Sequence, residues 1–323
     1  MTKIDLITGI LGSGKTTFIR RYARHLIDKG MRIAILENDF GAVNADMLML
    51  QDLKCDNCQL AMITGGGDPD CHRRRFKTQL ISLSMQGFDR VIVEPSGIFD
   101  MDEFFDTLHE PPIDSWFEVG CILTVADAET DDILTDQMEY FLGSEAACCG
   151  KLLLSKCREG DREVASERIL AHINRALEFI RCDRRLSSKD VFSADWENMT
   201  DADYELLMNS GYRNSAYVKQ FSFEDIHSEV HYFMNIRVPE SEAEKMINGI
   251  MADERCGKIF RIKGSLPAEN GEWLRINAMK ENTVINRVRE GQAVLIVIGD
   301  DIDRSAVDSH IVPLNTDSEY ISI

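Results

Sequence analysis

The sequence predicts an α/β fold with a mostly parallel sheet, followed by a smaller α+β domain. In the first part of the chain, short apolar segments rich in β-branched residues alternate with stretches long enough for helices. A glycine-rich loop lies between the first apolar segment and a helical pattern. After a polar stretch, further apolar segments and two helical patterns follow in an order typical of an antiparallel sheet with helices on one face. We therefore expect domains at 1–200 and 217–323, joined by a linker at 201–216.

The glycine-rich loop carries the strongest motif of the chain. Residues 9–16 read GILGSGKT and satisfy G-x-x-x-x-G-K-[ST], between the apolar segment KIDLIT and a helical pattern that ends near Gly30. In such a loop the backbone N–H groups surround phosphates, Lys15 reaches the β- and γ-phosphates, and the Thr16 hydroxyl ligates Mg²⁺. The first domain is thus predicted to be a P-loop nucleotide-binding domain. The expected nucleotide contacts in the loop are Gly12, Ser13, Gly14, Lys15, Thr16 and Thr17.

Polar residues follow three of the later apolar segments, which end near residues 36, 94 and 155. Ligands of parallel sheets bind beyond the carboxyl ends of the strands, so Asp39, Glu94, Ser155 and Lys156 are candidate site residues. A carboxylate at this position can hold Mg²⁺ or orient an attacking water molecule. The alternatives are a turn or helix cap for Asp39 and a surface carboxylate for Glu94.

Composition excludes several classes of function. The net charge of −19 disfavours binding to nucleic acid. No apolar run reaches the roughly 18 residues that span a bilayer, so no membrane partner is expected. The N-terminus lacks a signal-peptide pattern, and the nine cysteines are predicted to be reduced thiols or metal ligands. We therefore expect a cytoplasmic protein.

The order of these motifs resembles the CobW-like family of P-loop GTPases, which is related to HypB and UreG. GILGSGKTT, NDFG, EPSG and a cysteine-bearing turn between the last two carry the resemblance, and GKIFRIKGSL and AVLIVIGDDIDRSAV extend it to the C-terminal part. The resemblance implies a slow, Mg²⁺-dependent GTPase in which Lys15, Asp39 and Glu94 serve catalysis. It implies that Asp39 lies near Mg²⁺ and the γ-phosphate, and that Glu94 and Gly97 sense the γ-phosphate.

The segment that matches the guanine-reading motif of the family departs from it. The family has Asn-Lys-x-Asp, whereas this chain has Ser155, Lys156, Cys157 and Arg158. An aspartate accepts two N–H donors of guanine, and an arginine has donors only. Guanine specificity is therefore in doubt: GTP is expected first because of the family, and ATP is the alternative.

The cysteine-bearing turn also departs from the family, whose metal motif is Gly-Cys-x-Cys-Cys. Here Asp68, Asp70 and Cys71 provide two carboxylates and one thiol, and Cys55 and Cys58 are further candidate ligands. Carboxylates are harder ligands than thiolates, so the turn should prefer Zn²⁺, Co²⁺ or Ni²⁺ to Cu(I). The alternative is ordinary turn chemistry and a packed cysteine.

Three functions remain open. The first is a metallochaperone, or an insertion or activation factor, that couples its nucleotide state to metal delivery to a client metalloprotein or cofactor-binding protein. The second is a nucleotide-dependent assembly factor with no metal of its own, and the third is a P-loop small-molecule kinase. A nucleotide-dependent homodimer is a further hypothesis.

Overall fold

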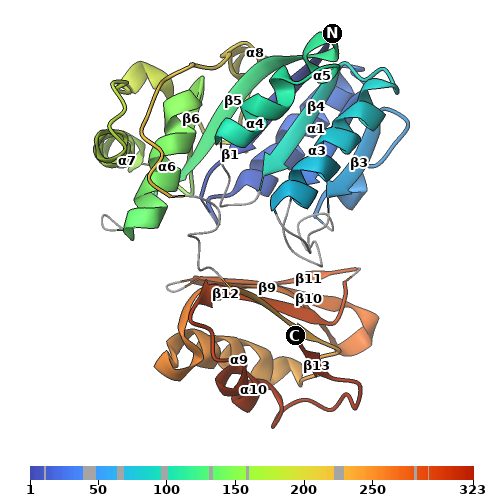
Figure 1. Ribbon diagram of the computed structural model, residues 1–323. Helices are drawn as coiled ribbons and strands as arrows, with labels where there is room; N and C mark the ends of the chain where they lie inside the picture. The colour runs from blue at the N-terminus through green and yellow to red at the C-terminus, as the bar shows by residue number, and fades with distance from the viewer. Residues whose placement is uncertain are drawn as a thin grey trace. The chain divides into compact units, whose positions relative to one another are not determined.

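The computed structural model describes residues 1–10, 12–38, 49–63, 69–95, 101–130, 134–157, 160–221, 229–279, 282–289 and 291–323. The chain forms two compact units, Met1–Phe223 and Glu224–Ile323. Each unit has its own sheet and its own apolar core, so each is described by itself (Figure 1).

The first unit contains a seven-stranded sheet with the order β3-β2-β4-β1-β5-β6-β7. Its paired strands are all parallel, so both faces must be covered by helices. The strands are β1 (Thr2–Thr8), β2 (Ile33–Asn38), β3 (Cys58–Ile63), β4 (Arg90–Pro95), β5 (Phe117–Asp127), β6 (Lys151–Ser155) and β7 (Val191–Phe192). The first strand thus lies in the middle of the sheet, between β4 and β5.

Helices cover both faces of this sheet. The helices are α1 (Lys15–Asp28), α3 (Pro69–Ser84), α4 (Met101–His109), α5 (Ile113–Trp116), α6 (Asp136–Cys148), α7 (Arg162–Phe179) and α8 (Asp201–Met208). The apolar faces of α1 and α8 pack with β1, β2, β4, β5 and β6 in one core. In Figure 1, α3, α4 and α6 lie in front of the sheet, on its other face. This arrangement confirms the predicted P-loop α/β fold.

A charged cluster is buried inside the first unit. Both carboxylate oxygens of Asp5 in β1 accept hydrogen bonds from Arg90 Nη1 in β4, at 2.5 and 2.6 Å. The Tyr22 hydroxyl donates to the same carboxylate at 2.9 Å, and the Cys121 backbone N–H donates at 3.1 Å. Gly120 makes room, because a Cβ there would lie 2.3 Å from Asp5 Oδ1. The charges are therefore matched within the protein, as buried ions require.

The segment expected to be a linker packs on the first unit. Residues 201–208 form α8, which begins with a capping box in which Thr200 and Asp203 exchange hydrogen bonds. Tyr204 and Leu207 of α8 are buried in the core of the first unit. Further along, the Val218 N–H donates to the Ile180 carbonyl at 2.9 Å. The boundary between the units therefore falls at Phe223 and Glu224, later than the sequence suggested.

The second unit is a smaller α+β domain. Its paired strands are antiparallel and have the order β11-β10-β9-β12-β8-β13. Helices α9 and α10 pack against the sheet in a single apolar core and lie together below it in Figure 1. The elements are β8 (Glu229–Met234), α9 (Glu240–Ala252), β9 (Lys258–Pro267), β10 (Trp273–Met279), β11 (Asn282–Val288), β12 (Val294–Asp300), α10 (Arg304–Ile311) and β13 (Ile321–Ser322).

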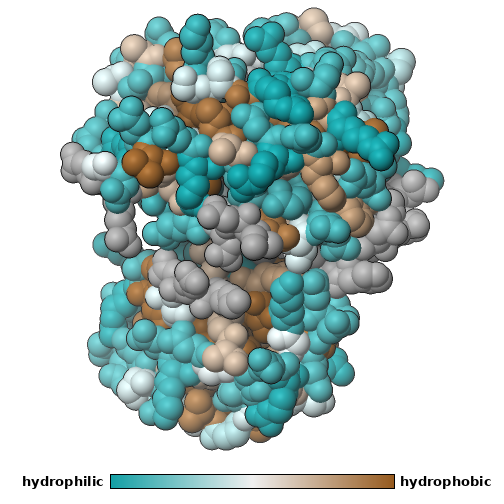
Figure 2. Space-filling view, turned by 90° about the vertical axis from the view of Figure 1, so that its left-hand side faces the viewer, coloured by the Kyte–Doolittle hydropathy of each residue, from teal (hydrophilic) through white to brown (hydrophobic). Residues whose placement is uncertain are grey.

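The surface of both units is mostly polar on the face that Figure 2 shows, with small apolar groups between hydrophilic side chains. Among the helices within the described residues, none is long and apolar enough to cross a membrane.

Candidate nucleotide-binding site

The P-loop connects β1 to α1 and needs glycine at two ends. Gly9 has φ of 142°, and a Cβ there would lie 2.4 Å from the Val125 carbonyl oxygen and 2.5 Å from Ser13 Oγ. Gly14 caps α1 with φ of 103°. Both φ values lie where side chains are strained, so these glycines allow the chain to turn tightly at the N-terminus of α1. The free N–H groups at this helix end form the phosphate-binding feature that the motif predicted.

Lys15 and Thr16 occupy the first turn of α1 and are both buried. Lys15 Nζ donates to the Gly9 carbonyl at 2.8 Å, which holds the ammonium group over the loop. Thr16 Oγ1 donates to Glu94 Oε1 at 2.8 Å. Glu94 belongs to β4, next to β1 in the sheet, so the order of the strands brings its carboxylate to the loop. A hydroxyl and a carboxylate oxygen side by side are hard donors, and they fit Mg²⁺.

On the β5–β6 side, the loop meets Ser155 and Lys156. Ser155 Oγ donates to the Ser13 carbonyl at 2.6 Å and so ties the end of β6 to the P-loop. Lys156 has a positive φ of 52°, and its Nζ lies 2.6 Å from Asp127 Oδ2 at the end of β5. Both predicted residues therefore lie beside the loop. The sequence analysis assigned no role to Asp127, although an acidic residue at the end of a central strand is a signal of a site.

Glu145 is a second residue that the sequence analysis missed. It lies in α6, is fully buried, and faces the loop closely enough to interact with Lys15 and the Gly9 N–H. Burial raises the pKa of Glu145 to about 8, although Lys15 and the Gly9 N–H act in the opposite direction. No motif contains this residue, and only the packing of α6 beneath the loop reveals it.

Several predicted site residues lie outside the described part of the chain. These are Asp39, Asp68, Gly97 and Arg158, and the side chain of Asp70 is likewise not described. Of the P-loop residues, Gly12, Ser13 and Gly14 precede α1 as expected, and the Thr17 side chain is exposed on the helix.

The candidate metal ligands are divided between two ends of one strand. The backbones of Cys55 and Cys58 exchange hydrogen bonds in a tight turn at the start of β3, and burial raises the pKa of the Cys58 thiol to about 12. Cys71 is exposed in the first turn of α3, after the end of β3 at Ile63. The strand alone separates Cys58 from Ile63 by roughly 17 Å. Cys55 and Cys58 therefore cannot complete an ion site at residues 68–71, which corrects that expectation.

Comparison with known families gives a match over residues 3–181, more than half of the chain, to the nucleotide-binding domain described as CobW/HypB/UreG. The chain belongs to this family. The match covers the P-loop, Glu94 and Ser155, which the structure brings together, and it confirms the resemblance seen in the motifs.

Two curated relatives come from Escherichia coli K12. The zinc chaperone YeiR is 34% identical over 128 residues, which cover 39% of this chain and 38% of YeiR. The zinc chaperone YjiA is 30% identical over 185 residues, which cover 53% of this chain and 54% of YjiA. The matched region thus spans about half or less of each relative.

Among solved structures, the Zn(II)-bound YjiA GTPase from E. coli aligns over 98% of this chain and 99% of its own, at 17% identity and a TM-score of 0.39. The hydrogenase maturation factor HypB from Archaeoglobus fulgidus aligns over 54% of this chain and 76% of its own, at 15% identity and a TM-score of 0.34.

Proposed function

We propose that the first unit is a Mg²⁺-dependent nucleoside triphosphatase whose nucleotide state controls delivery of a metal ion to a client metalloprotein. The observation that carries the proposal is the hydrogen bond from Thr16 to Glu94. It links the residue expected to ligate Mg²⁺ with the strand end that precedes the EPSG segment. A change at the γ-phosphate can therefore reach β4 through a single buried contact.

GTP is the proposed nucleotide, in line with the family. Lys156 lies beside the loop and can cover the flat face of a base, and Asp127 holds its ammonium group. Because Arg158 offers no acceptor for the guanine N–H groups, we propose weak discrimination between GTP and ATP. The comparison that tests this is the ratio of GTP to ATP affinity in the wild type and in Arg158→Asp. A preference for GTP above about a hundredfold in the wild type would mean that another residue supplies the acceptor.

The proposed cargo is a divalent ion held by Asp68, Asp70 and Cys71. The names of YeiR and YjiA as zinc chaperones support Zn²⁺, and the mixed oxygen and sulfur ligands suit Zn²⁺, Co²⁺ and Ni²⁺. The turn lies in the sequence between NDFG and EPSG, the two segments expected to respond to the γ-phosphate. We therefore propose that metal affinity at this turn differs between the nucleotide states.

Titration calorimetry with GTP and ATP in the presence of Mg²⁺ tests the nucleotide site. Lys15→Ala should weaken nucleotide binding by about a hundredfold or more, roughly 2.7 kcal/mol. Glu94→Gln should keep binding but lose most phosphate release. Lys29→Ala is the matched control, because Lys29 follows the other end of α1, where it pairs with Asp201 on the surface. Full affinity in a folded Lys15→Ala protein would contradict the assignment.

Titration of Zn²⁺, Co²⁺ and Ni²⁺ into nucleotide-free, GDP-bound and GTP-analogue-bound protein tests the delivery step. The affinity should differ between states and fall in Asp68→Ala/Asp70→Ala and in Cys71→Ser. Equal affinities in all states would favour the alternative of an assembly factor without a metal of its own. Phosphate release that requires an added small-molecule acceptor would favour a kinase.

A further inference from the structure

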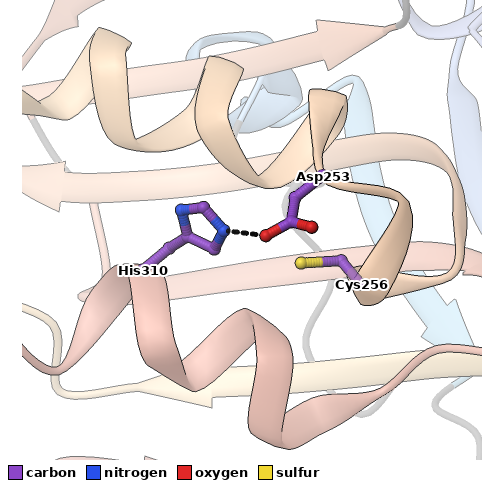
Figure 3. Close-up of side chains that lie close together, drawn as sticks. All are labelled: Asp253, Cys256 and His310. Atoms are coloured by element: carbon purple, nitrogen blue, oxygen red, sulfur yellow. Dashed lines mark hydrogen bonds and ion pairs between the residues drawn. The ribbon is translucent and has the colours of Figure 1, made fainter.

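A second group of metal-ligand side chains lies in the C-terminal unit, far along the chain from the P-loop motifs. Asp253, Cys256 and His310 each offer one ligand atom, and these atoms lie within 4.8 Å of one another. Within the described residues, no other group of three such side chains meets this condition. Figure 3 shows the carboxylate, the thiol and the imidazole pointing toward one another from the end of α9 and from α10.

The segment that carries Asp253 and Cys256 is held by backbone hydrogen bonds. The Asp253 N–H donates to Gly249 in the last turn of α9 at 3.1 Å, and the Cys256 N–H donates to the Asp253 carbonyl at 2.9 Å. The Cys256 carbonyl in turn accepts from the Asp303 N–H, just before α10, at 3.2 Å. The two ligands are thus fixed relative to each other and to the helix that carries the third.

His310 is positioned by the close approach of α9 and α10. A Cβ at Gly249 would lie 3.1 Å from His310 Nδ1, so glycine lets the imidazole ring pass close to the α9 backbone. His310 Nε2 lies 2.8 Å from Asp253 Oδ2, which directs this nitrogen toward the cluster. The ring is held from two sides, as ligands of a preformed site must be.

We propose that Asp253, Cys256 and His310 bind one divalent ion of the Zn²⁺ type, with a fourth position open to water or to a ligand from another protein. Tetrahedral Zn²⁺ with nitrogen and oxygen at about 2.0 Å and sulfur at about 2.3 Å needs ligand atoms roughly 3.3–3.8 Å apart. The described separations of 2.8 Å and up to 4.8 Å lie on both sides of this range. Small side-chain movements would therefore admit the ion. Mixed nitrogen, oxygen and sulfur ligands favour Zn²⁺ or Co²⁺ over Mg²⁺.

Arg255 is the built-in competitor for this site. Its Nη2 lies 2.6 Å from Asp253 Oδ2 and its Nε lies 3.0 Å from Oδ1, so a guanidinium now neutralises the carboxylate. The Arg255 side chain is 75% exposed, whereas Asp253 is 15% exposed. An exposed guanidinium can turn into water at little cost. The ion would then take its place, and the thiol would release its proton to solvent on binding.

Absorption titration of the full-length, metal-stripped protein with Co²⁺ tests the proposal, because tetrahedral Co²⁺ and its bond to thiolate are both visible. The titrations use a Cys71→Ser background, so that the ligand set of the nucleotide domain does not contribute its thiol. One Co²⁺ per chain should bind with thiolate absorption, with equal affinity whether GDP or a GTP analogue is present. Zn²⁺ should displace it. This result would stand even if the nucleotide-controlled turn failed its own test.

Variants decide whether the three residues are the ligands. Cys256→Ser and His310→Gln should each weaken Co²⁺ binding by about tenfold or more, the effect typical of removing a ligand contact. His231→Gln is the matched control, because His231 makes a similar contact with Glu229 at 3.1 Å in the same unit without a thiol. It should leave binding unchanged.

Arg255→Ala keeps all three ligands and removes the competitor. It should tighten Co²⁺ binding several-fold, an effect that a purely structural ion pair would not produce, and it needs no change in the buried cysteine. Equal Co²⁺ binding in the wild type, Cys256→Ser and His310→Gln would overturn the proposal. So would unchanged or weaker binding in Arg255→Ala.

Discussion

Asp5 and Asp253 are both carboxylates held by an arginine, yet their surroundings differ. At Asp5, the arginine is as inaccessible as the acid: the side chains of Arg90 and Asp5 are 8% and 0% exposed. At Asp253, the arginine is mostly in water. The exposure of the cation, more than the chemistry of the anion, separates a cluster that holds the fold together from one that can exchange its cation for another.

Removing the buried partner should have the largest effect. Arg90→Ala leaves Asp5 charged and uncompensated in the centre of the sheet, so the free energy of unfolding should fall by about 3–5 kcal/mol. Hydrogen exchange of the β1 and β4 amides measures this in the first unit alone.

Lys3→Ala is the control on the same strand. Lys3 pairs with Glu118 at 3.0 Å with both side chains nearly half exposed, so its loss should cost between 0 and about 1 kcal/mol. If the two variants change protection equally, burial of the Asp5–Arg90 pair does not matter as argued.

Glu145 extends the comparison to a buried carboxylate that faces a lysine instead of an arginine. Its pKa is raised from 4.5 to about 8 in the folded protein, so folding favours the protonated form. Its contribution is therefore fully present below pH 4.5 and is lost as pH rises toward and beyond 8. The free energy of unfolding should fall by about 2 kcal/mol between pH 6 and 8.5 from this group.

Urea unfolding at several pH values checks the prediction for Glu145. Glu145→Gln keeps the shape of the side chain and cannot ionise, so the decrease in stability toward alkaline pH should become smaller. Identical pH dependence in the wild type and Glu145→Gln would mean that Glu145 is ionised throughout this range.

Arg255→Ala should have the smallest effect on folding and completes the comparison with Arg90→Ala. Because the Arg255 side chain lies mostly in water and Asp253 keeps its contact with His310, the thermal midpoint of the metal-free protein should change little. Differential scanning calorimetry measures both arginine variants under the same conditions. A decrease in midpoint as large as that of Arg90→Ala would remove the distinction between the two clusters.

The strands of the nucleotide domain were largely predictable because buried parallel strands are continuous apolar runs. The segments ending near Asn38, Pro95, Asp127 and Ser155 all appear as strands. Strand β3 was missed because CQLAMI is short and follows a C-x-x-C pattern that suggested metal instead. Helix α8 was taken for a linker because its composition is polar, although Thr200 and Asp203 form a recognisable capping box.

The P-loop half of the site was predictable because its residues are local in sequence, and the rest was not. The sequence indicates that Asp5, inside an apolar strand, needs a partner, but nothing in it points to Arg90, which lies 85 residues away. His310 joins Asp253 only because α9 and α10 pack together. Pairings of this kind depend on tertiary packing and leave no periodic signal in the chain.

The central position of β1 has a consequence for the order of synthesis. Ile4 pairs with Val91 on one side and with Val119 on the other, so the first strand to leave the ribosome waits for two partners made much later. Contacts of such long separation form slowly, and an unpaired apolar strand is prone to aggregate meanwhile. The phosphate loop that follows β1 cannot acquire its final geometry until β5 has emerged. Nascent chains should therefore become able to bind nucleotide late in translation of the first unit.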